Sequence, residues 1–197
     1  MKLIENIKRN TGLSALNKSL RTTKRNKFVH NLVTARKIGI LGIVNTPNDF
    51  EEIISFQRFL SDKNIQVETL VYYPGKEIPP QLLMRKGVNI FNKNEVNWYG
   101  KPTNSYIERF CSQEFDILID LSMDELFTIR WISTLSRSKF KVGAMGYTGN
   151  PYDLVISVEE TKKQIPYLIE QMVHYLNLIN NRFAQEQEEL VNHNSEN

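Results

Sequence analysis

Short apolar runs alternate with segments of helical periodicity along most of this chain, and that alternation limits the folds open to it. The run KIGILGIVN over 37–45 ends at the turn-forming NTPND, and from Asp49 onward apolar residues recur at helical spacing. Further strand-like runs lie at 65–73, 87–91, 115–122, 139–146 and 152–157. Runs this short and this apolar are typical of strands buried on both faces of a parallel sheet.

Helical patterns fill the gaps between these runs. We expect a helix from Asp49 to Leu60, capped by Asn48 or Asp49, and others ending near Cys111 and covering 126–132. A final helix carries an apolar stripe from Ile165 to Phe183. Strands that alternate with helices, joined by right-handed crossovers, predict an α/β fold: a single doubly wound, mostly parallel sheet of Rossmann-like type.

The length of 197 residues suits one domain of this kind. We assign residues 1–36 to a basic helical arm and 37–183 to the α/β domain. Residues 184–197, QEQEELVNHNSEN, carry too little apolar surface to offset the entropy lost on ordering, so we expect a disordered polar tail.

In a doubly wound sheet, ligands bind at the carboxyl ends of the strands. The residues that follow the strands here are Asn45, Thr46, Asn48, Asp120 and Ser122, and they are our candidate ligand-binding residues. The competing interpretation is that NTPND and the acids after the fourth strand only cap the next helices. No GxGxxG motif follows the first strand, so a dinucleotide site is not expected.

The arm is separated from the rest of the chain by charge. Residues 1–37 hold ten Lys or Arg and one acid, a net charge of +9, whereas the remainder is net −6. Leu13, Leu16 and Leu20 fall at helical spacing, and basic residues occupy the other positions. The candidate nucleic-acid-binding residues are Lys8, Arg9, Lys18, Arg21, Lys24, Arg25 and Lys27. Three partners fit such a helix: RNA or DNA phosphates, an anionic membrane surface, or an acidic surface of its own domain or of another protein.

Cysteine and histidine usage argues against several function classes. Cys111 is the single cysteine, so no internal disulfide forms, and three scattered histidines have no metal-ligand spacing. We therefore expect no metal, no cofactor and no catalytic residues. The apolar runs are too short for a transmembrane segment and the N-terminus does not resemble a secretory signal, so we expect a cytoplasmic protein.

Two kinds of function remain after these exclusions. The first is a non-enzymatic interaction protein whose basic arm contacts RNA or a ribonucleoprotein, and this is our leading hypothesis because the charge is so concentrated. The second is a domain that binds a nucleotide or sugar phosphate at the strand ends. A protein bound at a membrane surface through its arm is the third alternative.

The pattern FDILIDLS, followed by LFTIRWISTLSRSKFKVG and then YDLVIS, resembles an uncharacterised family of small α/β proteins from Bacteroidota over residues 25–180. The resemblance implies a cytoplasmic bacterial protein with this fold and adds no chemistry. FDILIDL and KFKVG are also remotely similar to strands of the N-terminal domain of heptosyltransferase-type glycosyltransferases. Asn45 and Thr46 stand where that family has a Gly-Asp turn, and no sequence remains for its nucleotide-sugar domain. A complete glycosyltransferase is therefore not expected.

Overall fold

The computed structural model describes residues 2–83, 85–144 and 149–179. They form one six-stranded sheet with the strand order β3-β2-β1-β4-β5-β6, and every strand pair in it is parallel. The strands are β1 (Lys37–Ile43), β2 (Gln66–Tyr73), β3 (Val88–Asn92), β4 (Ile117–Asp120), β5 (Phe140–Gly143) and β6 (Leu154–Val155). The order reverses between β1 and β4, which defines the topological switch point of a doubly wound sheet.

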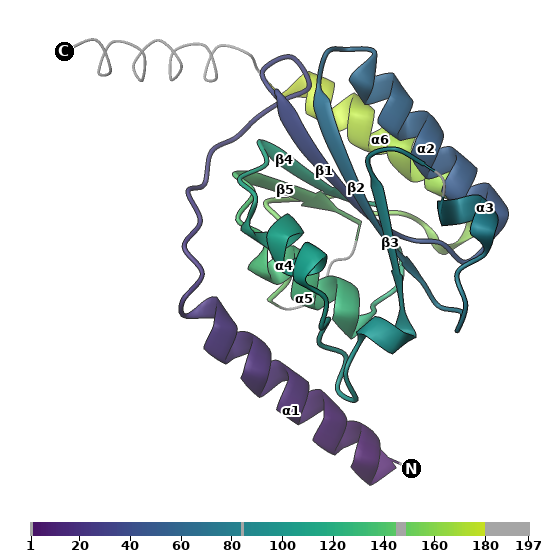
Figure 1. Cartoon of the computed structure of the whole chain (residues 1–197). Helices are drawn as coiled ribbons and strands as arrows, with labels where there is room; N and C mark the ends of the chain where they lie inside the picture. The colour runs from purple at the N-terminus through teal and green to yellow at the C-terminus, as the bar shows by residue number, and fades with distance from the viewer. Residues whose placement is uncertain (1, 84, 145–148, 180–197) are drawn as a thin grey trace.

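Helices cover both faces of the sheet, which confirms the predicted α/β fold (Figure 1). One face carries α2 (Pro47–Ser61) and α6 (Ile165–Leu178), and the other carries α4 (Ser105–Ser112) and α5 (Phe127–Leu135). The short α3 (Pro80–Leu83) and two 3-10 turns, Lys93–Glu95 and Glu160–Lys162, lie in the connections.

The central strand β1 is buried on both faces, as its apolar sequence predicts. Ile38 and Ile40 belong to the core beneath α2 and α6, whereas Leu41 belongs to the core beneath α4 and α5. A Cβ atom at Gly39 would lie 2.9 Å from the ring of Phe115, so a larger residue there would displace that ring. The sheet thus separates two apolar cores and fixes the positions of the strand ends.

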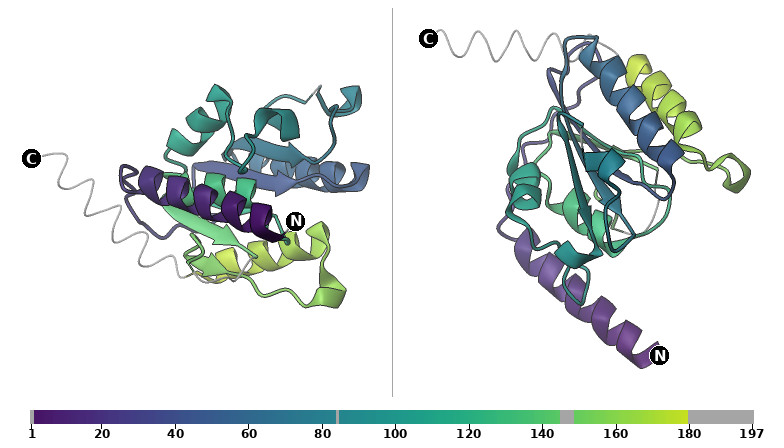
Figure 2. Two further views of the ribbon diagram at one scale, coloured as in Figure 1. Left: turned by 90° about the horizontal axis from the view of Figure 1, so that it is seen from below. Right: turned by 45° about the vertical axis from the view of Figure 1, so that its right-hand side comes forward.

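The arm begins with α1 (Lys2–Leu20), which lies outside α4 and α5 (Figure 2). From residue 21 the chain runs without regular structure to β1, and we call residues 21–36 the linker. The linker passes along β5, where the Phe28 N–H donates to the Lys139 carbonyl oxygen at 3.1 Å. The helical part of the predicted arm is therefore α1, and the rest is an extended segment held against the domain.

The amino end of the sheet is closed by one carboxylate. Asp116, just before β4, accepts hydrogen bonds from the backbone N–H groups of Arg36 at 2.8 Å and Lys37 at 3.0 Å. The Lys139 ammonium donates to it at 2.9 Å, and His30 Nε2 lies 3.6 Å away. Burial by itself would raise the pKa of Asp116, but these donors outweigh burial and hold the pKa below its usual value.

Two sequence predictions need adjusting at the C-terminal side. The last strand is expected over 152–157 but spans only Leu154–Val155, because it is an edge strand that pairs with β5 at two residues. The final helix ends at Leu178. Its expected extension to Phe183, the tail 184–197 and part of the glycine-containing link at 145–148 lie outside the described residues.

Candidate functional site

A cavity of about 360 Å³ lies at the switch point, where the carboxyl ends of β1 and β4 meet. Four of the five predicted ligand-binding residues line it: Asn45, Thr46, Asn48 and Ser122. The other lining residues are Ile43, Asp49, Leu121, Met123, Asp124, Lys163, Gln164, Ile165 and Pro166. The structure therefore brings together side chains from two loops about 75 residues apart in sequence, as the strand-end argument requires.

The loop after β1 is shaped by a capping box at the start of α2. Thr46 is the N-cap, and its side chain accepts a hydrogen bond from the Asp49 N–H at 3.2 Å. In return the Asp49 carboxylate accepts from the N–H groups of Asn45 at 2.9 Å and Thr46 at 2.8 Å. Our expectation that Asn48 or Asp49 is the N-cap was wrong, because Pro47 at the start of the helix makes the residue before it the cap.

The capping box leaves the two asparagines of this loop available. Asn45 and Asn48 are exposed, and no hydrogen bond from either side chain to a described residue is found. Capping and ligand binding are therefore compatible in NTPND, because Thr46 and Asp49 cap the helix while Asn45 and Asn48 face the cavity.

Asp120 ends β4 beneath the cavity and does not line it. Its side chain is fully buried, accepts from the Tyr152 hydroxyl at 2.7 Å and accepts from the Ser122 N–H at 2.9 Å. Burial raises the pKa of Asp120 to about 6, against the lowering effect of these hydrogen bonds. Asp120 therefore shapes the loop that presents Ser122, and it also ties that loop to the segment before β6.

Ser122 contributes the most unusual polar group of the cavity wall. The residue is 4% exposed, and its hydroxyl oxygen is buried without a hydrogen bond to any described group. The hydroxyl lies near enough to the Asp120 carboxylate to help lower its pKa. A buried hydroxyl without a hydrogen bond costs free energy, so its presence in a cavity wall favours a ligand atom as its partner.

Lys163 supplies the positive charge at this cavity, and sequence reasoning missed it. Its ammonium lies 2.8 Å from Glu160 and 3.6 Å from Asp124. Lys163 and Gln164 immediately precede α6, and the crossover that follows β6 brings them to the ends of β1 and β4. Pro166 near the start of a long apolar stripe was the available signal, because it marks the beginning of α6.

The arm contacts the domain through one face of the C-terminal half of α1. Leu16 is 3% exposed, and Gly12 packs so closely that a Cβ atom there would lie 2.8 Å from the Phe127 ring. Residues nine positions earlier lie about two and a half turns away and hence on the opposite side. They are Leu3 and Ile7, which are 72% and 51% exposed, and neighbouring Ile4 is 71% exposed.

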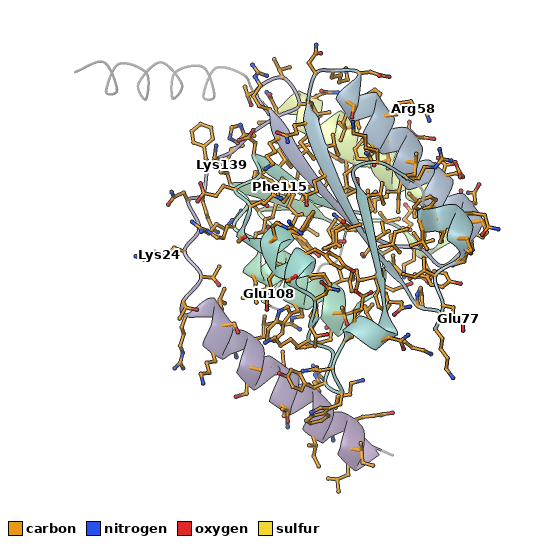
Figure 3. All side chains as sticks on the ribbon, in the orientation of Figure 1. Lys24, Arg58, Glu77, Glu108, Phe115 and Lys139 are labelled. Atoms are coloured by element: carbon orange, nitrogen blue, oxygen red, sulfur yellow. The ribbon has the colours of Figure 1, made fainter. Side chains whose placement is uncertain are left out.

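The predicted nucleic-acid-binding residues fall into two groups. Lys8, Arg9, Lys18, Arg21 and Lys24 are exposed, and no ion pair between them and a described residue is found. In Figure 3 the Lys24 side chain extends from the linker away from the domain. These five cations are therefore accessible to an anionic partner.

Arg25 and Lys27, by contrast, are engaged by the domain itself. Arg25 donates to the carbonyl oxygens of Ser138 at 2.6 Å and Lys139 at 3.0 Å, and it forms an ion pair with Asp153. Lys27 lies 3.2 Å from the same carboxylate. An acidic group of its own domain is thus the partner of this end of the arm.

Two further titratable groups lie between β5 and the helices on that side, and neither lines the switch-point cavity. Burial raises the pKa of the Cys111 thiol to about 12, in keeping with a packed rather than a nucleophilic cysteine. Burial also lowers the pKa of Lys141 to about 7. The Lys141 amine donates to the carbonyl oxygens of Ser133 at 2.7 Å and Thr134 at 3.0 Å, near the C-terminal end of α5.

Comparison with protein families gives one match, to a family of unknown function (DUF6913) over residues 8–179. The match covers most of the chain. The protein belongs to this family. It includes the second half of α1 and the linker as well as the sheet, so the docked part of the arm is a family feature. A search of curated proteins finds no match.

This DUF6913 member lacks two features in the part of the chain that the structure describes. No described group of three or more His, Cys, Asp or Glu side chains has the arrangement of a metal site. None of the described helices is both long and apolar enough to span a membrane.

Proposed function

We propose that this protein binds a small phosphorylated molecule, a nucleotide or a sugar phosphate, in the cavity at the ends of β1 and β4. The observation that carries the proposal is the meeting of Asn45, Asn48 and Ser122 in one cavity at the switch point. Open α/β sheets bind ligands at this place because two loops diverge there and leave a crevice. The cavity volume of about 360 Å³ is at the smaller end of the range for small-molecule sites.

The proposal concerns binding and not a reaction. The polar groups of the cavity are amides, hydroxyls and carboxylates that form hydrogen bonds, together with one ammonium group from Lys163. Apolar side chains such as Ile43 and Leu121 form the rest of the wall, so a bound molecule would be partly removed from water.

Thermal unfolding with added ligands tests this proposal. A ligand present at ten times its Kd raises the free energy of unfolding by about 1.4 kcal/mol. We expect this rise with a sugar phosphate or a nucleotide, and we expect Asn45→Ala combined with Asn48→Ala to abolish it. Asn26→Ala, an exposed asparagine in the linker, is the matched control and should retain the rise. Equal stabilisation of both variants by the ligand would count against the cavity.

A second candidate function is contact between the arm and a ribonucleoprotein. Two observations on α1 favour it: five cations are free of internal partners, and the side of the helix opposite the domain carries exposed Leu3, Ile4 and Ile7. Cations suit RNA phosphates, whereas exposed aliphatic side chains suit a protein surface. A ribonucleoprotein offers both.

Fluorescence anisotropy with a single-stranded RNA oligonucleotide tests the electrostatic half of this candidate. Deleting residues 1–36 would also remove Arg25 and its contacts, so we use Lys8→Ala combined with Arg9→Ala and Lys18→Ala. Binding should weaken steeply with salt, and the triple variant should flatten that dependence by about 0.7 per lost phosphate contact. Binding that is unaffected by salt and by the variant would contradict RNA contact. Flotation of the protein with anionic vesicles, lost in Leu3→Ser, would favour a lipid surface instead.

A further inference from the structure

The two helices that begin at the cavity differ at their N-termini. The start of α2 is closed by the capping box, and the Asp49 carboxylate already neutralises its positive end. The start of α6 has no such closure, because the N-cap residue Gln164 makes no side-chain hydrogen bond to the helix. Lys163 precedes it and adds a full positive charge. The positive side of the cavity is therefore at α6.

The opposite wall has a different character. Asp49 and Asp124 bring negative charge to the cavity, and the exposed amide of Asn45 lies beside them. Carboxylates and amides accept and donate hydrogen bonds to hydroxyl groups, but the two carboxylates repel a second anion. The buried Ser122 hydroxyl, which makes no hydrogen bond to a described residue, provides one more such group in the same cavity.

The apolar part of the wall separates two classes of phosphorylated ligand. It consists of aliphatic residues, Met123 and Pro166, and no described aromatic side chain lines it. Stacking on an aromatic ring contributes much of the binding of a nucleobase, so a base would lack its usual support here. A hydroxyl-rich molecule needs no such ring.

We propose that the ligand is a phosphorylated sugar or other small polyol, with its phosphate at Lys163 and the N-terminus of α6. Its hydroxyl groups form hydrogen bonds with Asp124, Asn45 and Ser122. This inference rests on the proposed small-molecule function and narrows its substrate class. The surface ion pairs of Lys163 are weak enough to be exchanged for a phosphate, because such pairs contribute little in water.

Calorimetric titration of the full chain tests the inference with a panel of triose, pentose and hexose phosphates. The parent sugars, inorganic phosphate, uridine monophosphate and adenosine monophosphate complete the panel. At least one sugar phosphate should bind at least tenfold more tightly than its parent sugar, than inorganic phosphate and than either nucleotide. Lys163→Gln should weaken this binding at least tenfold. Lys162→Gln, at a neighbouring lysine that does not line the cavity, should leave it within twofold.

The outcomes separate the two levels of the proposal. If a nucleotide binds and is lost with Asn45→Ala while no sugar phosphate binds, the polyol inference is wrong and the cavity remains a ligand site. If a sugar phosphate binds equally well to Lys163→Gln and Lys162→Gln, the placement of the phosphate is wrong. If nothing in the panel binds, both the inference and the proposed function fail.

Discussion

The two ends of β4 carry one buried aspartate each, and the two carboxylates are in opposite situations. At the amino end, Asp116 accepts hydrogen bonds from two backbone N–H groups and from the Lys139 ammonium, and its pKa is held low. At the carboxyl end, Asp120 has a hydroxyl and one backbone N–H as donors, and burial raises its pKa to about 6.

This difference shows how the sheet divides its tasks. The amino end is satisfied by the chain's own linker and lysine, and its charges stabilise the fold. The carboxyl end holds a carboxylate that would be more stable protonated and, in Ser122, a buried hydroxyl without a hydrogen bond. Polar groups retained at a cost to stability are a common property of binding sites, so the carboxyl end is where we place the ligand.

The largest effect on this comparison should come from Asp116→Asn. The substitution removes the charge that holds Lys139 and replaces one acceptor oxygen by a donor facing the N–H groups of Arg36 and Lys37. We expect a loss of about 3 kcal/mol in the free energy of unfolding at pH 7, measured by urea unfolding. Asp120→Asn is the matched control and should cost less than 1 kcal/mol. A larger loss for Asp120→Asn would reverse the assignment of the two ends.

The next effect tests whether the linker belongs to the stable end. Arg25→Ala removes two hydrogen bonds to carbonyl oxygens and the ion pair with Asp153, so we expect a loss of about 2 kcal/mol in chemical unfolding. Lys24→Ala, at the neighbouring exposed residue, should change stability by less than about 0.5 kcal/mol. Similar small losses in both variants would mean that the linker contributes no stability.

A pH series sharpens the comparison at the carboxyl end. The pKa of Asp120 is about 6 in the folded protein, above the model value of 3.8, so the folded state binds the proton more tightly. The stability contributed by this group is present at low pH and is lost as pH rises through about 6. Between pH 5 and 7.5 the wild type should lose about 1 kcal/mol relative to Asp120→Asn, measured by urea unfolding at each pH. Parallel stability curves for the two proteins would contradict the raised pKa.

The smallest effect is expected from Ser122→Ala. Removing a buried hydroxyl that makes no hydrogen bond leaves no partner unsatisfied, so stability should stay within about 0.5 kcal/mol of the wild type or rise slightly. Thermal unfolding without ligand measures this, and Ser133→Ala is a control because its hydroxyl does donate to the Ile129 carbonyl oxygen at 3.0 Å. A clear loss for Ser122→Ala would mean that its hydroxyl has a structural partner.

The sequence predicted the fold well because the strands are short, apolar and separated by amphipathic helices. The strand order could be inferred as doubly wound from the crossover rule alone. The length of β6 could not, because Tyr152–Ser157 reads as a full strand while only two residues find a partner in β5. Pairing at an edge depends on the neighbouring strand and not on local composition.

The site was predicted in part for the same reason. Asn45, Thr46, Asn48 and Ser122 follow strands directly, so the sheet rule places them together. Lys163 follows no strand end closely, and its position depends on how α6 packs against α2. Asp120 was expected to contact ligand, but strand geometry points its side chain toward Tyr152. Local sequence does not encode that contact, which joins residues 32 positions apart.

The most direct test of the account is an amide NMR titration of isotopically labelled full-length protein with the sugar phosphates and nucleotides. The account predicts that a binding compound shifts the signals of residues 45–49, 121–124 and 163–167 and leaves those near Asp116 unchanged. Shifts confined to the amino end of the sheet or to α1, or no shift with any compound, would contradict the assignment of the carboxyl end as the ligand site.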